Sequence, residues 1–179
     1  MERRLSVGQG DCYDDLYREY LPRIHNYIRL RVDGEDLAQD LTASVFERAI
    51  SRQHTLRRPE AFGAWLFRIA RNTVAGHYRQ RRFVVPLDHA DVQAAPGDSP
   101  PEAVMRREEL ERLQQAVSTL SEREQEIIRL KFTGGLGNQE IARVLRLRAG
   151  HVAVILYRAL RKLRARLEEE NSSPQAAEG

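Results

Sequence analysis

The stretch AFGAWLFRIARNTVAGHYRQRRF, residues 61–83, decides how the rest of the chain is interpreted. In a helix that turns about 100° per residue, its side chains separate onto two faces. One face carries arginines, namely Arg68, Arg71, Arg79 and Arg82. The other face is mainly apolar and comprises Phe62, Leu66, Ile69, Ala70, Thr73 and Val74. The pattern predicts an amphipathic helix with one buried side and a row of guanidinium groups on the other.

The residues around this arginine row indicate a polyanionic partner. Seven arginines but one acid, Glu60, lie between residues 57 and 82. Aromatic side chains are interleaved with them, and nucleic acids offer both phosphates for arginine and bases for stacking. An ordinary amphipathic core helix with buried aromatic rings explains the same stretch without a ligand. Both interpretations stay open on these residues alone.

The composition predicts an all-α protein. A length of 179 residues accommodates one ordinary domain or two small ones. Glycines and prolines fall at boundaries, and no strongly alternating strand pattern is present. Cys12 is the only cysteine, which excludes an internal disulfide and suits a reducing cytosol. No apolar run approaches the roughly 18 residues of a membrane span, so we expect a cytoplasmic protein without membrane insertion.

Residues 11–83 form the first predicted domain. A helix over 11–32 contains Pro22, which predicts a kink or a break. A second helix from residue 35 to about 51 buries a face of Leu37, Leu41, Val45 and Ala49. Its other side carries Asp36, Gln39 and Asp40, with Phe46 near the boundary. The acids suit the positive end of the helix dipole, and they equally suit a docking surface for a basic partner.

Two connecting segments differ sharply in charge. The segment 51–59, SRQHTLRRP, is polar and basic, as expected of a loop available for contacts. Residues 84–105 contain no lysine or arginine and hold four of the seven prolines. We therefore expect 84–105 to be a flexible Pro-rich linker that ends the first domain.

Residues 106–168 form the second predicted domain, with four helices. A charged helix over 102–119 has an apolar seam of Val104, Leu110, Leu113 and Val117. Ser121 and Glu124 have capping-box spacing at the start of the next helix. Asn138 then caps a short helix that a turn at Arg146–Leu147 joins to a long one. This order predicts a helix-turn-helix, and the generic alternative is a helical hairpin.

Taken together, these parts resemble the extracytoplasmic-function sigma factors, the small promoter-selecting subunits of bacterial RNA polymerase. In the first domain the matching stretches are LYREYLPRIHNYI (16–28), EDLAQDLTASVFERA (35–49) and FGAWLFRIARNTVAGHYR (62–79). In the second domain they are LSEREQEIIRLKF (120–132), NQEIARVL (138–145) and GHVAVILYRALRKLR (150–164). The resemblance implies partners: core RNA polymerase, promoter DNA and an anti-sigma factor.

The resemblance also assigns roles by position. In this family the first domain binds the polymerase clamp and melts the minus-ten element, and the second reads the minus-thirty-five element. The residues implied for polymerase binding are Asp36, Gln39, Asp40 and Phe46. Those implied at the melting element are His54, Arg57, Arg68, Arg71, Asn72, His77, Arg79 and Arg82. Trp65 matches a position that is mainly core. For the upstream element, the available side chains are Arg148, His151, Arg158, Arg161 and Lys162.

Two positions depart from the family pattern. Arg146 stands where the turn usually has glycine, and a non-glycine residue at positive φ costs about 1 kcal/mol. Ala153, Val154 and Ile155 stand where the recognition helix usually offers polar side chains. We therefore expect the second domain to hold upstream DNA mainly through phosphates, DNA shape and thymine methyl groups.

An enzyme is not expected, because the chain lacks the pattern of a catalytic site. The five histidines are scattered without metal spacing, and residues 134–137 lack the lysine of a phosphate-binding loop. We accordingly expect no cofactor. The main alternative function is a helix-turn-helix regulator that binds DNA without polymerase. A sigma-like decoy, which binds polymerase but starts no transcripts, is a second alternative.

Overall fold

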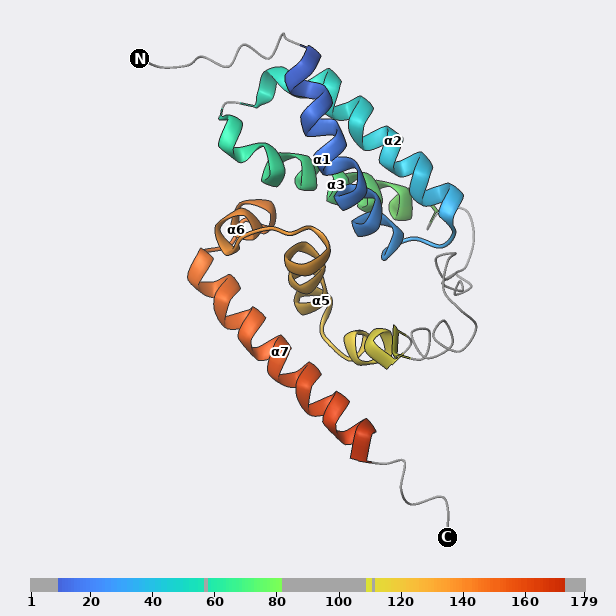
Figure 1. The fold of residues 1–179 in the computed structure, drawn as a ribbon, viewed down its shortest axis with the longest axis vertical. Coiled ribbons are helices and arrows are strands. Elements are labelled where there is room, and N and C mark those ends of the chain that lie inside the picture. The colour runs from blue at the N-terminus through green and yellow to red at the C-terminus, as the bar shows by residue number, and fades with distance from the viewer. Residues whose placement is uncertain (1–9, 57, 82–108, 111, 173–179) are drawn as a thin grey trace.

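The computed structural model describes residues 10–56, 58–81, 109–110 and 112–172 (Figure 1). These residues form helices joined by short turns, and no strand occurs among them, which confirms the predicted all-α class. Within the same residues, no helix has the length and apolar character needed to cross a bilayer.

The first helical unit contains α1 (Gly10–Arg29), α2 (Glu35–Arg52) and α3 (Phe62–Arg81). Two short 3-10 turns, Gln53–Thr55 and Pro59–Ala61, connect α2 to α3. The predicted break at Pro22 is wrong, because α1 runs through this residue as one helix. Ile24, Tyr27 and Ile28 just beyond it are fully buried, and their packing offsets the hydrogen bond that proline cannot donate.

The apolar face predicted for α3 is confirmed. The apolar face is buried throughout, at Phe62, Leu66, Ile69, Ala70, Thr73 and Val74. The Thr73 hydroxyl donates to the carbonyl of Ile69 at 3.0 Å and accepts from Arg48 of α2 at 3.0 Å. Trp65 is also buried, and its indole N–H donates to the Thr55 hydroxyl at 3.2 Å. Trp65 therefore belongs to the core, as we expected.

The second unit begins with helical residues 109–110 and 112–118, followed by α5 (Glu122–Ile128) and a π-helical turn, Arg129–Thr133. It ends with α6 (Asn138–Leu145) and α7 (Ala149–Ser172). The predicted seam of the first helix is wrong at Leu110 and Leu113, which are half exposed. Val117 of the same seam is partly buried and packs against the buried Ala116 and Leu120. The expected linker at 84–105 lies outside the described residues, as does Val104.

The capping box at the start of α5 is confirmed. The Glu124 backbone N–H donates to the Ser121 hydroxyl, and the Glu124 carboxylate accepts from the Ser121 backbone N–H at 2.9 Å. The same carboxylate binds the ammonium group of Lys162 on α7 at 2.7 Å. The hydrogen bonds from Lys162 and then Ser121 lower the pKa of Glu124 from 4.5 to about 2. Glu124 thus completes the N-terminal cap of α5 and links this helix to α7 through an ion pair.

This arrangement predicts an acid-sensitive second unit. A carboxyl group with a lowered pKa in the folded state contributes stability above pH 4.5, which is lost as the pH falls towards about 2. We expect Glu124→Gln to lower the free energy of unfolding at neutral pH by about 1–2 kcal/mol. The difference from the wild type should shrink in acid. Urea unfolding at several pH values measures this, with exposed Glu122→Gln as the control. A constant difference from pH 7 to pH 2 would contradict it.

The turn between α6 and α7 contains a residue at positive φ that is not glycine, which is the unfavourable backbone conformation expected from the sequence. Arg146 is left-handed, with φ 55° and ψ 47°, and ends α6 through a backbone hydrogen bond to Ala142. The start of α6 differs from prediction: Gly137, rather than Asn138, is the N-cap residue. The Gly137 backbone N–H donates to the Glu140 carboxylate at 2.8 Å, so Asn138 is the first residue of the helix proper.

We expect Arg146→Gly to stabilise the protein by about 1 kcal/mol, because glycine adopts positive φ without a steric penalty. The matched control is Arg143→Gly, in the interior of the same helix, which should destabilise by about 1 kcal/mol. Urea denaturation of both variants measures these changes. If both variants destabilise the protein equally, the strain at Arg146 is absent.

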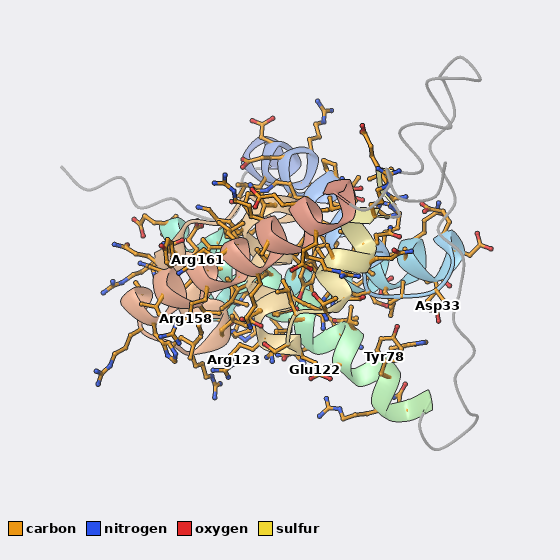
Figure 2. All side chains as sticks on the ribbon, turned by 90° about the horizontal axis from the view of Figure 1, so that it is seen from below. Asp33, Tyr78, Glu122, Arg123, Arg158 and Arg161 are labelled. Carbon is orange, nitrogen blue, oxygen red and sulfur yellow. The ribbon has the colours of Figure 1, made fainter. Side chains whose placement is uncertain are left out.

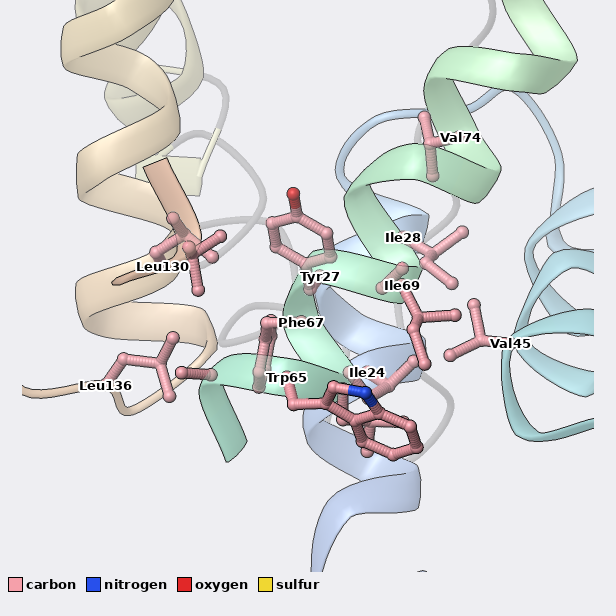
Figure 3. Close-up of a cluster of buried hydrophobic side chains, with 14 of the residues drawn as sticks. Ile24, Tyr27, Ile28, Val45, Trp65, Phe67, Ile69, Val74, Leu130 and Leu136 are labelled. Carbon is pink, nitrogen blue, oxygen red and sulfur yellow. The ribbon is translucent and has the colours of Figure 1, made fainter. Parts of the chain in front are cut away.

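The two units share one hydrophobic core, which the sequence did not reveal. The cluster of buried side chains runs from α1, α2 and α3 into α5, α6 and α7 (Figure 3). At the junction, Phe67 packs edge-on against Tyr27, with ring centroids 5.3 Å apart, in the same cluster as Leu130 and Leu136. Gly134 allows this approach, since a Cβ there would lie 3.0 Å from the Phe67 ring.

Candidate polymerase and nucleic-acid interfaces

The outer side of α2 carries an acidic face. Asp36, Gln39 and Asp40 are exposed, as predicted, and Glu47 extends the acidic side by two turns. Phe46 does not share this face, contrary to our prediction. It is buried, with its ring centroid 4.6 Å from that of Tyr17. The apolar side chain that is exposed near this face is Ile50, half of whose surface is accessible.

The outer side of α3 carries the basic row. Arg68, Asn72 and Arg79 are exposed and follow one another at helical spacing. Arg71 is also exposed but lies to one side of this line, where its Nε is 3.6 Å from the Glu126 carboxylate of α5. The structure therefore brings three of the predicted side chains into a line on the surface and places the fourth at the junction of the two units.

The remaining residues predicted for the melting element are placed differently. His54 is exposed on the 3-10 turn Gln53–Thr55 that directly follows α2. His77 is half-buried beside the Tyr78 ring, 5.6 Å between centroids, and its Nε2 atom is buried without a hydrogen-bond partner. At about 100° per residue, His77 lies opposite Arg68 on the helix, so the structure separates it from the basic row. Arg57 and Arg82 lie outside the described residues.

The second basic surface lies on α7. Arg148, His151, Arg158 and Arg161 are exposed, and Figure 2 shows Arg158 and Arg161 on this helix. Lys162 differs, because its ammonium group binds Glu124. Val154 and Tyr157 lie among the exposed residues, and the Arg161 guanidinium is 6.0 Å from the centre of the Tyr157 ring. The surface is thus basic with exposed apolar groups between the charges.

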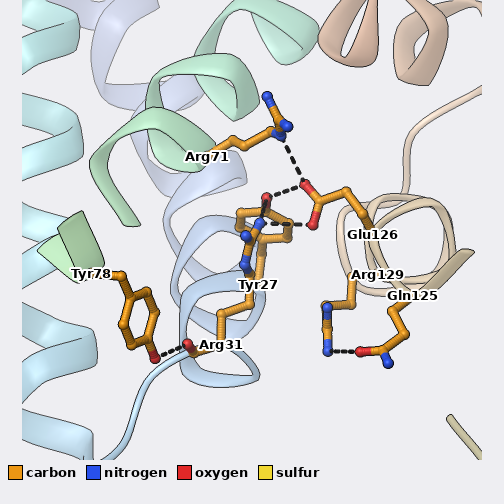
Figure 4. A network of polar contacts seen from close by, with 7 residues as sticks. All are labelled: Tyr27, Arg31, Arg71, Tyr78, Gln125, Glu126 and Arg129. Carbon is orange, nitrogen blue, oxygen red and sulfur yellow. Dashed lines mark hydrogen bonds and ion pairs between the residues drawn. The ribbon is translucent and has the colours of Figure 1, made fainter. Parts of the chain in front are cut away.

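A polar network joins the two units (Figure 4). The Glu126 carboxylate of α5 accepts hydrogen bonds from the Tyr27 hydroxyl and from Arg31, both at 2.7 Å. Arg31 also donates to the Tyr27 hydroxyl, and the Tyr78 hydroxyl donates to the Arg31 carbonyl at 2.5 Å. Burial, and then the charge of Glu126, raises the pKa of Tyr27, so this phenol stays protonated.

Sequence reasoning missed this network because its members carry no local signal. Glu126 lies within a charged run, and Tyr27 continues an ordinary apolar stripe. Their contact spans 99 positions of sequence. The position of Ile50 could have been predicted from the sequence. Helical spacing places it on the same face of α2 as Asp36, Asp40 and Glu47.

The chain matches two family models, Sigma-70 region 2 over residues 16–84 and Sigma-70 region 4 over residues 110–163. It is 30% identical over 162 residues to the ECF RNA polymerase sigma factor SigL of Mycobacterium tuberculosis, covering 86% of this chain and 88% of that protein. It is 36% identical over 174 residues to the ECF RNA polymerase sigma factor BldN of Streptomyces coelicolor, covering 93% of this chain and 64% of BldN.

Solved structures agree with the fold. RpoE of Bartonella quintana, in complex with the anti-sigma factor NepR, matches 88% of this chain and 98% of its own, with a TM-score of 0.70 and 22% identity. CnrH, in complex with the cytosolic domain of CnrY, matches 90% of this chain and 91% of its own, with a TM-score of 0.66 and 26% identity. With both sigma-70 regions in order and the helix-turn-helix in place, the chain belongs to the extracytoplasmic-function family of RNA polymerase sigma factors.

Proposed function

We propose that this chain binds core RNA polymerase, directs it to specific promoters and helps to melt the minus-ten element. The observation that carries this proposal is the exposed line of Arg68, Asn72 and Arg79 on α3, whose opposite face is buried. Guanidinium groups in a line suit the phosphates of a DNA strand, which position a protein without reading sequence. The chain acts by binding, in the cytoplasm with polymerase, and performs no catalysis of its own.

The acidic face of α2 is the proposed polymerase-docking surface. Asp36, Asp40 and Glu47 give it a charge opposite to that of a basic partner, and Ile50 adds an exposed apolar contact. Charge complementarity of this kind speeds association and selects the partner. Phe46 supports the face from beneath, as a core residue.

We expect Asp40→Arg to weaken binding to core polymerase by about tenfold or more, because it places a positive charge against a basic partner. Glu169→Arg, the same change in the exposed last part of α7, should leave binding nearly unchanged. Titration of labelled protein with core polymerase measures both dissociation constants. Equal binding by the two variants would place the docking surface elsewhere.

The second unit is proposed to hold upstream DNA. Four exposed basic side chains are available for phosphate contacts, namely Arg148, His151, Arg158 and Arg161. Val154 is also exposed and is available for contact with a thymine methyl group. Lys162 contributes less than we expected from sequence, because its ammonium group is already paired with Glu124.

An anti-sigma factor is the second proposed partner. Of two structures similar in fold, RpoE was solved with the anti-sigma factor NepR and CnrH with the cytosolic domain of CnrY. A broad groove of about 1420 Å³ lies beside α7. Its lining includes the apolar side chains of Leu113, Phe132 and Leu160 and the basic side chains of Arg29 and Arg164. These exposed apolar side chains support a protein partner that covers them.

A helix-turn-helix regulator that acts without polymerase remains the alternative. The exposed basic side of α7 is compatible with it. The two functions differ in one measurement. A sigma factor binds promoter duplex weakly until core polymerase is added, whereas a regulator binds its operator tightly by itself.

A further inference from the structure

Glu126 is a buried carboxylate whose hydrogen bonds and ion pairs all reach the other unit. Its side chain is 10% exposed, and it lies on α5. The Tyr27 hydroxyl and Arg31 of α1 bind it at 2.7 Å, and Arg71 of α3 lies at 3.6 Å. A buried charge with its partners on another unit contributes to holding the two units together, because losing those partners leaves it unpaired.

The junction is rich in positive charge. Among the described residues, the Arg31, Arg71 and Arg129 side chains lie near this one carboxylate. Burial, and then the charge of Arg31, lowers the pKa of Arg129. Glu126 thus offsets a repulsion between guanidinium groups. Without its charge, the same groups would favour separation of the two units.

A second polar contact supports the junction from the same face of α1, one turn before Tyr27. The Arg23 guanidinium donates to the carbonyl of Gly134 at 2.9 Å, in the turn that follows α5. Arg23 also pairs with Glu19 on its own helix and lies over the Tyr20 ring, 4.4 Å from its centre. This contact does not touch Glu126 or Arg71, so it allows an independent test.

We propose that the contact between the two units is an autoinhibitory latch, in which Glu126 occupies Arg71 and keeps it from DNA in the free protein. This inference rests on the proposed function, because it takes Arg71 to be part of the DNA-binding row. Opening the junction frees the Arg71 guanidinium for DNA beside the line of Arg68 and Arg79, and it lets the two units contact separate promoter elements. A negative side chain in the place of a phosphate is the simplest competitor for an arginine that binds DNA.

The first experiment measures the distance between the units in the free full-length protein. Donor and acceptor dyes are attached at Ala43→Cys on α2 and Ala165→Cys on α7, both exposed, in a chain with Cys12→Ser. Glu126→Gln removes the charge and keeps the shape, and we expect a lower and broader transfer efficiency. Glu122→Gln makes the same charge change on the exposed side of α5 and should leave the efficiency unchanged.

The second experiment measures binding of a short fluorescein-labelled single strand of mixed sequence, without polymerase. We expect Glu126→Gln to bind at least about fivefold more tightly than Glu122→Gln, a coupling of the usual allosteric size. Circular dichroism checks that both variants are folded. Arg23→Gln should open the junction in the same way, and Arg18→Gln at an exposed position is its control. This second pair of variants tests the proposal if Glu126→Gln is poorly folded.

An unchanged transfer efficiency in both Glu126→Gln and Arg23→Gln would overturn the latch. A lower transfer efficiency without tighter binding of the single strand would also overturn the latch, because the contact between the units would then have only a structural role. Failure of the proposed function is seen separately: wild-type protein that starts no transcripts with core polymerase would refute that function without altering the distance measurement.

Discussion

Replacing Phe67 by alanine should lower the free energy of unfolding by about 3–5 kcal/mol, the usual cost of deleting a fully buried aromatic ring. The ring has no exposed surface and packs edge-on against Tyr27. It also lies against Gly134, so its loss leaves a cavity at the junction of the two units. Because the core is continuous across this junction, we expect both units to be affected.

The matched control is Phe132→Ala, since Phe132 is 63% exposed. That change should cost less than about 0.5 kcal/mol. Urea denaturation, followed by circular dichroism, compares the two variants. If Phe132→Ala costs as much as Phe67→Ala, the junction is not packed as described.

The double variant Arg68→Ala with Arg79→Ala should reduce open-complex formation by at least about tenfold, since each charged hydrogen bond lost is worth about 1.5–3 kcal/mol. Both side chains are exposed, so the melting temperature should change little. Arg71 is left out deliberately, because it also pairs with Glu126. The control removes the same charge from Arg18 and Arg123, which are exposed on α1 and α5.

Permanganate reactivity of the melted promoter strand, measured over a range of salt concentrations, follows this change. Each lost phosphate contact should reduce the slope of log affinity against log salt by about one unit. If the double variant gave the same permanganate reactivity as the wild type at every salt concentration, the assignment of Arg68 and Arg79 on α3 to the DNA interface would be wrong.

Helical phase explains why α3 was predictable and the junction was not. The burial of Leu66, Ile69 and Val74 repeats at helical spacing, so a local pattern contains it. The hydrogen-bond partners of Glu126, Tyr27 and Arg31, lie 99 and 95 positions away, and no local pattern encodes them. A charged residue in a charged run is normally solvated, but tertiary contacts with α1 and α3 bury this one.

The same physics accounts for the errors within helices. Phe46 lies at the edge of the apolar face of α2, where a large ring packs inward against Tyr17. Leu110 and Leu113 were assigned to a buried seam, but tertiary packing selected the neighbouring face with Ala116. Pro22 was expected to interrupt α1, and the buried residues after it kept the helix intact.

In-vitro transcription with purified core polymerase and a pool of genomic promoter fragments tests the central claim most directly. We predict discrete transcripts that require this chain, and the loss of most of them with the Arg68→Ala, Arg79→Ala double variant. The control variant at Arg18 and Arg123 should retain them. An absence of chain-dependent transcripts, together with tight binding of the chain alone to a duplex fragment, would contradict the account and favour a regulator that acts without polymerase.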